Sequence, residues 1–181
     1  MRLPADAVLI IVDAQESIDP RPVAGHASAA DDNIAALVAA WRAEGLPLAH
    51  VGRQPPALSR ARDGEIVVAA EAASAFVGTA LEASLDELGA TTLVICGALA
   101  THALEASARH AADLGYQAFV VADACRAADA LDLNGRLWPA EDVRALALAR
   151  LSEAATLVDA ATALRAAATA KARQRRAAGK A

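Results

Sequence analysis

The sequence predicts a doubly wound α/β domain with three layers, α/β/α, built on a six-stranded and mostly parallel sheet. Apolar runs that do not alternate with polar residues are typical of strands buried on both faces, as in a parallel sheet. Helical patterns fill the intervals between these runs. Glycine follows three of the helical segments, at Gly45, Gly89 and Gly115, where a left-handed residue ends a helix before the next strand. Short connections of this kind indicate helices on both faces of the sheet.

The expected strands follow one another along the chain as short apolar runs. They are Val8–Val12, Leu46–Val51, Ile66–Val68, Thr92–Cys96, Gln117–Val121 and Thr156–Val158. Helices are expected at residues 27–44, 79–88, 101–114 and 140–152. Residues 52–65 form a polar loop after the second strand, which we expect near the mouth of any site, and residues 126–139 are predicted to be irregular.

The chain of 181 residues fits one domain with a single core. We assign residues 1–160 to this domain and residues 161–181 to an alanine-rich C-terminal helix that ends in a basic tail. The tail contains Lys171, Arg173, Arg175 and Arg176. Positive charge complements a helix C-terminus, and one short basic run without aromatic residues favours a solvated tail over a nucleic-acid-binding arm.

Charge and cysteine usage limit the class of function. The net charge of −5 gives no reason to expect nucleic acid as a partner. Cys96 and Cys125 lie in apolar stretches without metal or disulfide spacing, and the first apolar run is too short for a signal peptide or a span of ~20 residues. His50 stands alone, which favours packing or hydrogen bonding over metal ligation. We therefore expect a cytoplasmic protein without a metal or other cofactor and without a membrane contact.

Four motifs in a defined order carry the most specific signal in the sequence. They are Ile10-Ile11-Val12-Asp13-Ala14-Gln15, Ser74-Ala75-Phe76-Val77-Gly78-Thr79, Leu93-Val94-Ile95-Cys96-Gly97-Ala98-Leu99-Ala100-Thr101-His102-Ala103 and Val120-Val121-Ala122-Asp123-Ala124-Cys125. Together they resemble the isochorismatase-like cysteine hydrolase superfamily, from about residue 8 to about residue 158. The resemblance implies a site at the carboxyl ends of the strands and a homo-oligomeric assembly.

The resemblance also implies three catalytic positions, of which this chain keeps one. Asp13 matches the family's general base. Ala70 stands where the family has a lysine, and Ala103 stands where it has a nucleophilic cysteine at a helix N-terminus. Neither alanine side chain can attack a carbonyl or exchange a proton. Thioester-type acyl transfer is therefore not available at position 103.

Four further residues are candidates for ligand binding. Gln15 is expected to face the pocket, and Leu99 belongs to a turn that, with the helix start at residues 101–103, presents backbone N–H groups to an anion or carbonyl oxygen. His102 resembles, with a displacement of one residue, a histidine of the isochorismatases proper. Phe76 lies in the second motif, where packing against the following helix is the alternative to a binding role.

More than one function stays open at the level of sequence. The leading interpretation is a non-catalytic or very weakly active family member that binds a small molecule or pairs with a partner. The alternative is an active hydrolase of a small amide, ester or vinyl ether, in which Asp13 activates water and the backbone turn forms the oxyanion hole. A third interpretation, that Ala103 was introduced to trap a ligand, is disfavoured by the simultaneous alanine at position 70.

Overall fold

A computed structural model describes residues 2–4, 6–12, 26–52, 61–98 and 102–178 of the chain. The first half contains β1 (Val8–Val12), α1 (His26–Glu44), β2 (Leu48–Gly52), β3 (Ile66–Ala69), α2 (Leu81–Glu87) and β4 (Thr92–Gly97). The second half contains α3 (Ala103–Asp113), β5 (Gln117–Cys125), β6 (Ala130–Leu131), β7 (Leu137–Trp138), α4 (Ala140–Leu151), β8 (Thr156–Val158) and α5 (Ala160–Ala178). All six predicted strands and the four predicted helices before residue 152 are present.

The main sheet has six strands in the order β3-β2-β1-β4-β5-β8, and every neighbouring pair is parallel. The predicted fold class is thus confirmed. The chain leaves β1 toward β2 and β3 on one side, and it later adds β4, β5 and β8 on the other. The strand order therefore reverses between β1 and β4, and ligands of doubly wound sheets bind in the crevice at the carboxyl ends of such strands.

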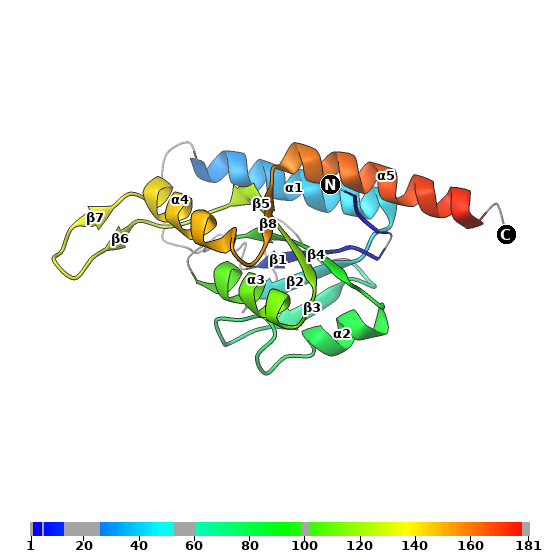
Figure 1. Ribbon diagram of the computed structural model, residues 1–181, viewed down its shortest axis with the longest axis horizontal. Helices are drawn as coiled ribbons and strands as arrows, with labels where there is room; N and C mark the ends of the chain where they lie inside the picture. Colours follow the sequence, from blue (N-terminus) through cyan, green and yellow to red (C-terminus); the bar gives the residue numbers. More distant parts are fainter. Residues whose placement is uncertain (1, 5, 13–25, 53–60, 99–101, 179–181) are drawn as a thin grey trace.

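Helices cover both faces of the sheet (Figure 1). Helices α1 and α5 share one apolar cluster with Leu9 and Ile11 of β1, while α2, α3 and α4 share the other with Val8, Ile10 and Val12. Alternate residues of a single strand thus enter two different cores. This is the physical reason for the continuous apolar run of β1, in which all five residues are buried.

Helix α5 packs along α1 through a row of alanines (Figure 1). Ala163, Ala167 and Ala170 are buried in the α1 cluster, together with Trp41 of α1. Small side chains let the two helix backbones lie close together. Residues 160–170 therefore share the core of the domain, although the sequence places a boundary at residue 160.

The segment after the fifth strand differs from its prediction in two ways. Strand β5 continues to Cys125 rather than ending at Val121, and residues 126–139 contain an antiparallel hairpin, β6–β7, instead of irregular chain. The Asp132 carboxylate accepts hydrogen bonds from the amides of Asn134 and Arg136, which closes the hairpin turn. Local side-chain bonds of this type leave no apolar periodicity, so the pattern of the sequence did not reveal the hairpin.

Candidate active site at the carboxyl ends of the strands

The carboxyl ends of β1, β4 and β5 are joined by backbone hydrogen bonds. The Ala98 amide donates to the Val12 carbonyl oxygen (2.8 Å), and the Arg126 amide donates to the Gly97 carbonyl oxygen (3.0 Å). Gly97 has φ +138°, and a Cβ at this position would lie 1.9 Å from the Val12 oxygen. Only glycine fits there, because L side chains rarely adopt this φ and no space exists for them. The candidate site lies where the carboxyl ends of β1 and β4 come into close contact.

Position 103, predicted to be the lost nucleophile position, is the first residue of α3. Its methyl group is 6% exposed and belongs to the apolar cluster on the α3 face of the sheet. The amides of the first helical turn have no carbonyl partner within the helix, and the N-cap residue His102 makes no side-chain capping bond. The N-terminus of α3 therefore has backbone donors, and its first side chain is a buried methyl group.

Position 70, at which the resemblance implies a lysine in the family, directly follows β3. The Ala70 amide extends the β3 ladder by donating to the Gly52 carbonyl oxygen (3.4 Å). The Ala70 methyl is half-buried and packs against the same apolar cluster that contains Ala103. The structure thus brings the two alanine positions to one cluster, where both contribute apolar surface and neither contributes charge.

A serine of α3 fastens the second motif to the helix that begins at position 103. Ser107 Oγ donates to the Ala103 carbonyl oxygen (2.6 Å) and accepts a hydrogen bond from the Ala75 amide (2.9 Å). Ser74 Oγ lies within hydrogen-bond distance of His110 Nδ1 (2.9 Å), further along the same helix. The frame around the two alanines is therefore held by hydrogen bonds that do not involve them.

Of the other predicted site residues, the structure describes Phe76 and His102. Phe76 is 7% exposed, and its ring packs against His110 and Tyr116, with ring centroids 5.3 and 6.1 Å away. These contacts give Phe76 a packing role, the alternative stated above. His102 is exposed at the head of α3. Asp13, Gln15 and Leu99 lie outside the described residues.

Both cysteines of the chain are buried, free thiols. Burial raises the pKa of the Cys96 thiol well above its usual range. Burial also raises the pKa of the Cys125 thiol to about 12, and its Sγ donates to the Val121 carbonyl oxygen (3.1 Å). A thiol with such a pKa is protonated at neutral pH and is a poor nucleophile. Neither cysteine is therefore an activated nucleophile.

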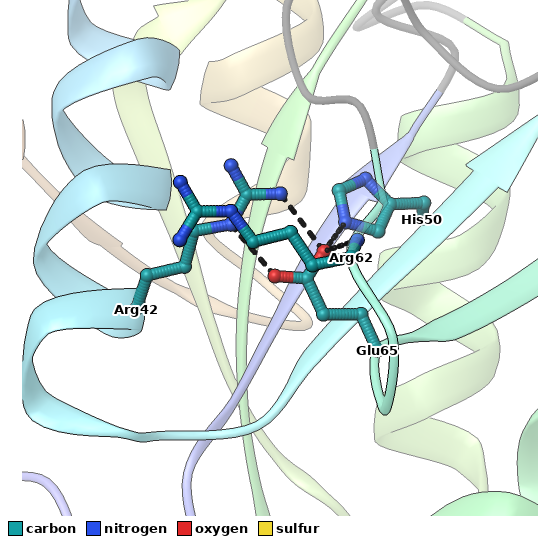
Figure 2. Close-up of polar contacts among 4 residues, drawn as sticks. All are labelled: Arg42, His50, Arg62 and Glu65. Atoms are coloured by element: carbon teal, nitrogen blue, oxygen red, sulfur yellow. Dashed lines mark hydrogen bonds and ion pairs between the residues drawn. The ribbon is translucent and has the colours of Figure 1, made fainter.

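A second polar cluster joins α1 to the strands β2 and β3 (Figure 2). Arg42 Nε and Nη2 donate to the two carboxylate oxygens of Glu65 at 2.6 and 2.9 Å, and the Arg62 amide donates to the same carboxylate at 2.8 Å. His50 Nε2 lies 2.8 Å from Glu65 Oε2. The packed and hydrogen-bonded His50 that the sequence favoured is confirmed.

The Glu65 cluster corrects one expectation about the polar loop. Glu65 and Arg62 precede β3, so they lie at its amino end, beside an open cavity of about 630 Å³ that Leu46 and Leu48 also line. The site described above is at the opposite, carboxyl end of the sheet. Residues 61–65 therefore do not form the mouth of the candidate site, because they lead into the amino end of β3. Residues 53–60 lie outside the described part of the chain.

Sequence reasoning missed a cation that does lie at the carboxyl edge. Arg126 directly follows β5, and its Nη1 lies 3.0 and 3.2 Å from the two carboxylate oxygens of Asp31 in α1. The signal that would have found Arg126 is its place immediately after the motif that ends in Cys125, at the carboxyl end of a predicted strand.

Two further features bear on the class of site. Across residues 2–4, 6–12, 26–52, 61–98 and 102–178, no three His, Cys, Asp or Glu side chains are grouped so as to hold a metal ion. No helix within the same ranges is long and apolar enough to cross a membrane. The arrangement is that of a three-layer α/β protein whose strand order reverses between β1 and β4 and which has backbone donors at the N-terminus of α3.

Comparison with known proteins assigns the family. A model of the isochorismatase domain matches residues 56–162, more than half of the chain. An uncharacterized isochorismatase-family protein of Escherichia coli, YecD, is 32% identical over 160 residues, which cover 71% of this chain and 84% of the relative. YrdC of Bacillus subtilis, also an uncharacterized isochorismatase-family protein, is 27% identical over 162 residues, covering 80% and 87%. This chain belongs to the isochorismatase family.

Solved structures agree with this assignment. The crystal structure of an isochorismatase-family protein from Chromobacterium violaceum has a TM-score of 0.84 and 32% sequence identity, and the match covers 93% of this chain and 97% of that one. An isochorismatase from Pseudomonas putida has a TM-score of 0.82 and 28% identity, covering 90% and 92%. The fold and the family of the chain are thus supported by sequence and by structure.

Proposed function

We propose that this protein binds a small molecule at the carboxyl edge of the sheet and has no cysteine-dependent hydrolase activity, so that it is non-catalytic or very weakly active. One observation carries the proposal: the residue at the head of α3 is a buried alanine, Ala103, while both thiols of the chain are buried elsewhere. The described part of the frame is held by backbone and serine hydrogen bonds, and the side chains at positions 70 and 103 lack the ammonium and thiol groups that the resemblance implies.

Acyl transfer through a cysteine requires a thiolate beside the carbonyl carbon that it attacks. Burial raises the pKa of the Cys125 thiol to about 12, so this thiol is protonated at pH 7. Position 70 offers no ammonium group that would stabilise a thiolate or orient a substrate. Two requirements of the family's cysteine chemistry are therefore unmet in this chain, which supports loss of the reaction rather than a shift of the nucleophile.

A second candidate is a slow hydrolase of a small amide, ester or vinyl ether, with Asp13 as the base that activates water. The observation that favours it is the head of α3, where first-turn amides lack partners in the helix and His102 adds no capping bond. Such donors can stabilise an oxyanion without a covalent nucleophile. This candidate function predicts a slow turnover in the activity assay described below.

The free state of both cysteines supports our further proposal of a cytoplasmic location.

Two experiments test the proposal: an activity assay of the purified protein, and the introduction of a lysine and a cysteine at positions 70 and 103. Purified protein is assayed on small amides, esters and vinyl ethers before and after treatment with iodoacetamide. We expect either no turnover or a slow turnover that the reagent does not change. Turnover that iodoacetamide abolishes would contradict the proposal, because it would require a working thiol. Turnover that is lost in Asp13→Asn and insensitive to the reagent would establish the slow hydrolase instead.

Restoration uses the double variant Ala70→Lys, Ala103→Cys. The helix N-terminus and the new ammonium group both favour the thiolate, so we expect iodoacetamide to label it at least tenfold faster at pH 7 than a control thiol. The control is Ala70→Lys, Ala106→Cys, which places the thiol one turn further along α3, where more of the side chain is exposed than at position 103. Equal labelling rates in two folded variants would show that the frame no longer supports the family's chemistry.

A further inference from the structure

Exposed apolar side chains gather in the arm that follows β5 and in the helix after it. Of the nine large apolar side chains that are exposed in the described part of the chain, five lie between residues 131 and 146. They are Leu131, Leu133, Leu137, Trp138 and Leu146. The first four belong to the β6–β7 hairpin, which projects beside α4 (Figure 1), and the last belongs to α4 itself. Grouped apolar side chains of this kind mark an interaction surface.

One face of the hairpin is apolar. Leu131 of β6 and Leu137 of β7 are paired directly across the two strands, so their side chains point to the same side. Leu133, in the turn between the strands, is fully exposed. The opposite face carries Trp138, whose ring lies 4.2 Å from the Arg136 guanidinium. A two-stranded hairpin buries little apolar surface by itself, so its leucines leave water only by contact with another surface.

The charged side chains of the arm, residues 126–139, have partners within the same chain. The Asp129 carboxylate accepts a hydrogen bond from the first amide of α4 (2.8 Å), and the Asp132 carboxylate accepts two from amides of the turn (2.8 and 3.0 Å). The Arg136 guanidinium lies over the indole ring, and Arg126 is paired with Asp31. Burying a charge is costly unless it is paired. Each charged side chain of the arm keeps its partner when the leucines are covered.

The outer side of α4 is also apolar. Its inner side, with Ala147, Leu148 and Leu151, is buried. A helix at a protein surface ordinarily turns polar residues outward, whereas Leu146 of α4 is 65% exposed and Ala149 is exposed beside Arg150. Small side chains next to a leucine leave room for an apolar side chain from another surface. The arm and this side of α4 are joined through Pro139 alone, so they form one continuous stretch of chain.

We propose that the arm of one copy lies against the outer side of α4 of a second copy, and that a two-fold axis relates the two contacts. Residues 126–139 contain two arginines and two aspartates, so two arms meet without net like charge, although each chain carries −5. A stable interface takes about 20–30 residues from each partner, more than the arm contains, so α4 takes part. Homodimer interfaces are more apolar than transient ones, which favours a second copy as the occupant. In a two-fold arrangement, the seating of one arm on the opposite α4 also seats the other.

The test mixes two variants that each disrupt one side of the contact. Leu133→Glu places a charge on the arm, and Leu146→Lys places one on α4; both side chains are exposed, so the fold of the single chain is retained. In sedimentation velocity at about 0.1 mM, the wild type should be a dimer, and each variant alone should lose at least about tenfold in dimer affinity. An equimolar mixture should recover at least about tenfold over either variant alone. One contact of the mixed dimer then joins the two leucines as in the wild type, and the other joins the two introduced charges, which have opposite signs.

The matched controls are Val77→Glu and Leu88→Lys, which place the same charges at exposed apolar positions near α2. Alone and mixed, they should sediment as the wild type does. A monomeric wild type would overturn the inference and leave the surface to a different protein. A dimer that Leu146→Lys leaves intact, or two disrupted variants that do not recover on mixing, would also overturn it, because the arm and α4 would then not face each other. The inference does not depend on the proposed function, and none of these outcomes changes that proposal.

Discussion

Glu65 links three parts of the fold through one carboxylate. The Arg42 guanidinium, with the Arg62 amide and His50, holds the pKa of Glu65 at about 2, below its ordinary value of 4.5. Burial lowers the pKa of His50 from 6.5, against the opposing effect of Glu65. The neutral imidazole therefore donates its Nε2–H to an ionised carboxylate at neutral pH. These hydrogen bonds hold α1, β2 and the start of β3 together, and we refer to Arg42, His50, Arg62 and Glu65 as the Glu65 clasp.

The clasp predicts a loss of stability in acid. Both folded-state pKa values lie below the unfolded values, so their contributions are complete at pH 7 and decline as the pH falls. The His50 contribution is lost below about pH 6.5, and the Glu65 contribution is lost between about pH 4.5 and 2. Urea unfolding at pH 7, 5 and 3 should show Glu65→Gln to be about 2 kcal/mol less stable than the wild type at pH 7. The difference should shrink at pH 3. The exposed-site variant Glu153→Gln should follow the wild type throughout, and a Glu65→Gln deficit that is the same at all three pH values would refute the ionised clasp.

Gly97 is the residue on which the junction of β1 and β4 depends. A methyl group there would meet the Val12 oxygen at 1.9 Å, so Gly97→Ala requires the two strands to move apart. We expect a loss of about 3 kcal/mol or more, measured by urea unfolding. Gly115→Ala is the matched control, because Gly115 also has positive φ (+90°) but open space around its Cα. That variant should lose only about 1 kcal/mol, from backbone strain alone. Similar losses in the two variants would mean that the strand junction tolerates the added atom.

At the scale of elements, α3 is the helix that organises the candidate site. It presents Ala103 at its head and holds the second motif through Ser107. Ser107→Ala would leave the buried Ala75 amide without its acceptor, and we expect a loss of about 1–2 kcal/mol of unfolding free energy. Ser152→Ala is the control, since Ser152 is exposed and its hydroxyl donates to the Ala149 carbonyl oxygen at the end of α4. Amide hydrogen exchange of Ala75 gives the direct measurement: its protection should fall in Ser107→Ala, and unchanged protection would place its acceptor elsewhere.

The β6–β7 hairpin is an element whose outer side chains have little to pack against within the described chain. Leu131, Leu133 and Leu137 are 72, 107 and 55% exposed, on an arm that projects beside α4 (Figure 1). The arm is nevertheless ordered by its own contacts, with the Arg136 guanidinium 4.2 Å from the centre of the Trp138 ring. Two-stranded hairpins of this length are marginally stable alone, and grouped exposed leucines are typical of interfaces.

At the scale of the whole molecule, this arm supports the proposal of a homo-oligomer. We expect the wild type to be at least dimeric by light scattering at about 0.1 mM protein, and the triple variant Leu131→Ser, Leu133→Ser, Leu137→Ser to shift toward monomer. The control Val77→Ser, Leu88→Ser removes exposed apolar side chains near α2 and should not change the mass. A monomeric wild type would refute the homo-oligomer, and an oligomer that survives the triple variant would place its interface elsewhere.

Prediction from sequence worked where the physical signal is local. Apolar runs such as Val8–Val12 are buried on both faces in any doubly wound sheet, so their order along the chain identifies the strands without knowledge of their neighbours. Gly89 and Gly115 end their helices with positive φ, as their positions after Leu88 and Leu114 indicate. The interpretation that positions 70 and 103 lack the family's lysine and cysteine stays a prediction, although an alanine cannot act as a nucleophile in any fold.

Only the tertiary structure decided which distant residues meet. Arg126 and Asp31 are 95 residues apart, and their contact exists because α1 packs over the ends of β4 and β5. The four-residue Glu65 cluster lies at the amino end of the sheet because β3 pairs with β2 in a register that places Ile66 beside Ala49. Side-chain hydrogen bonds and ion pairs between separate elements have no periodicity along the chain. The order of apolar runs, helix ends and motifs along the sequence therefore determined the fold class and the family, and the packing of α1 against the sheet determined that the Arg126 guanidinium pairs with Asp31.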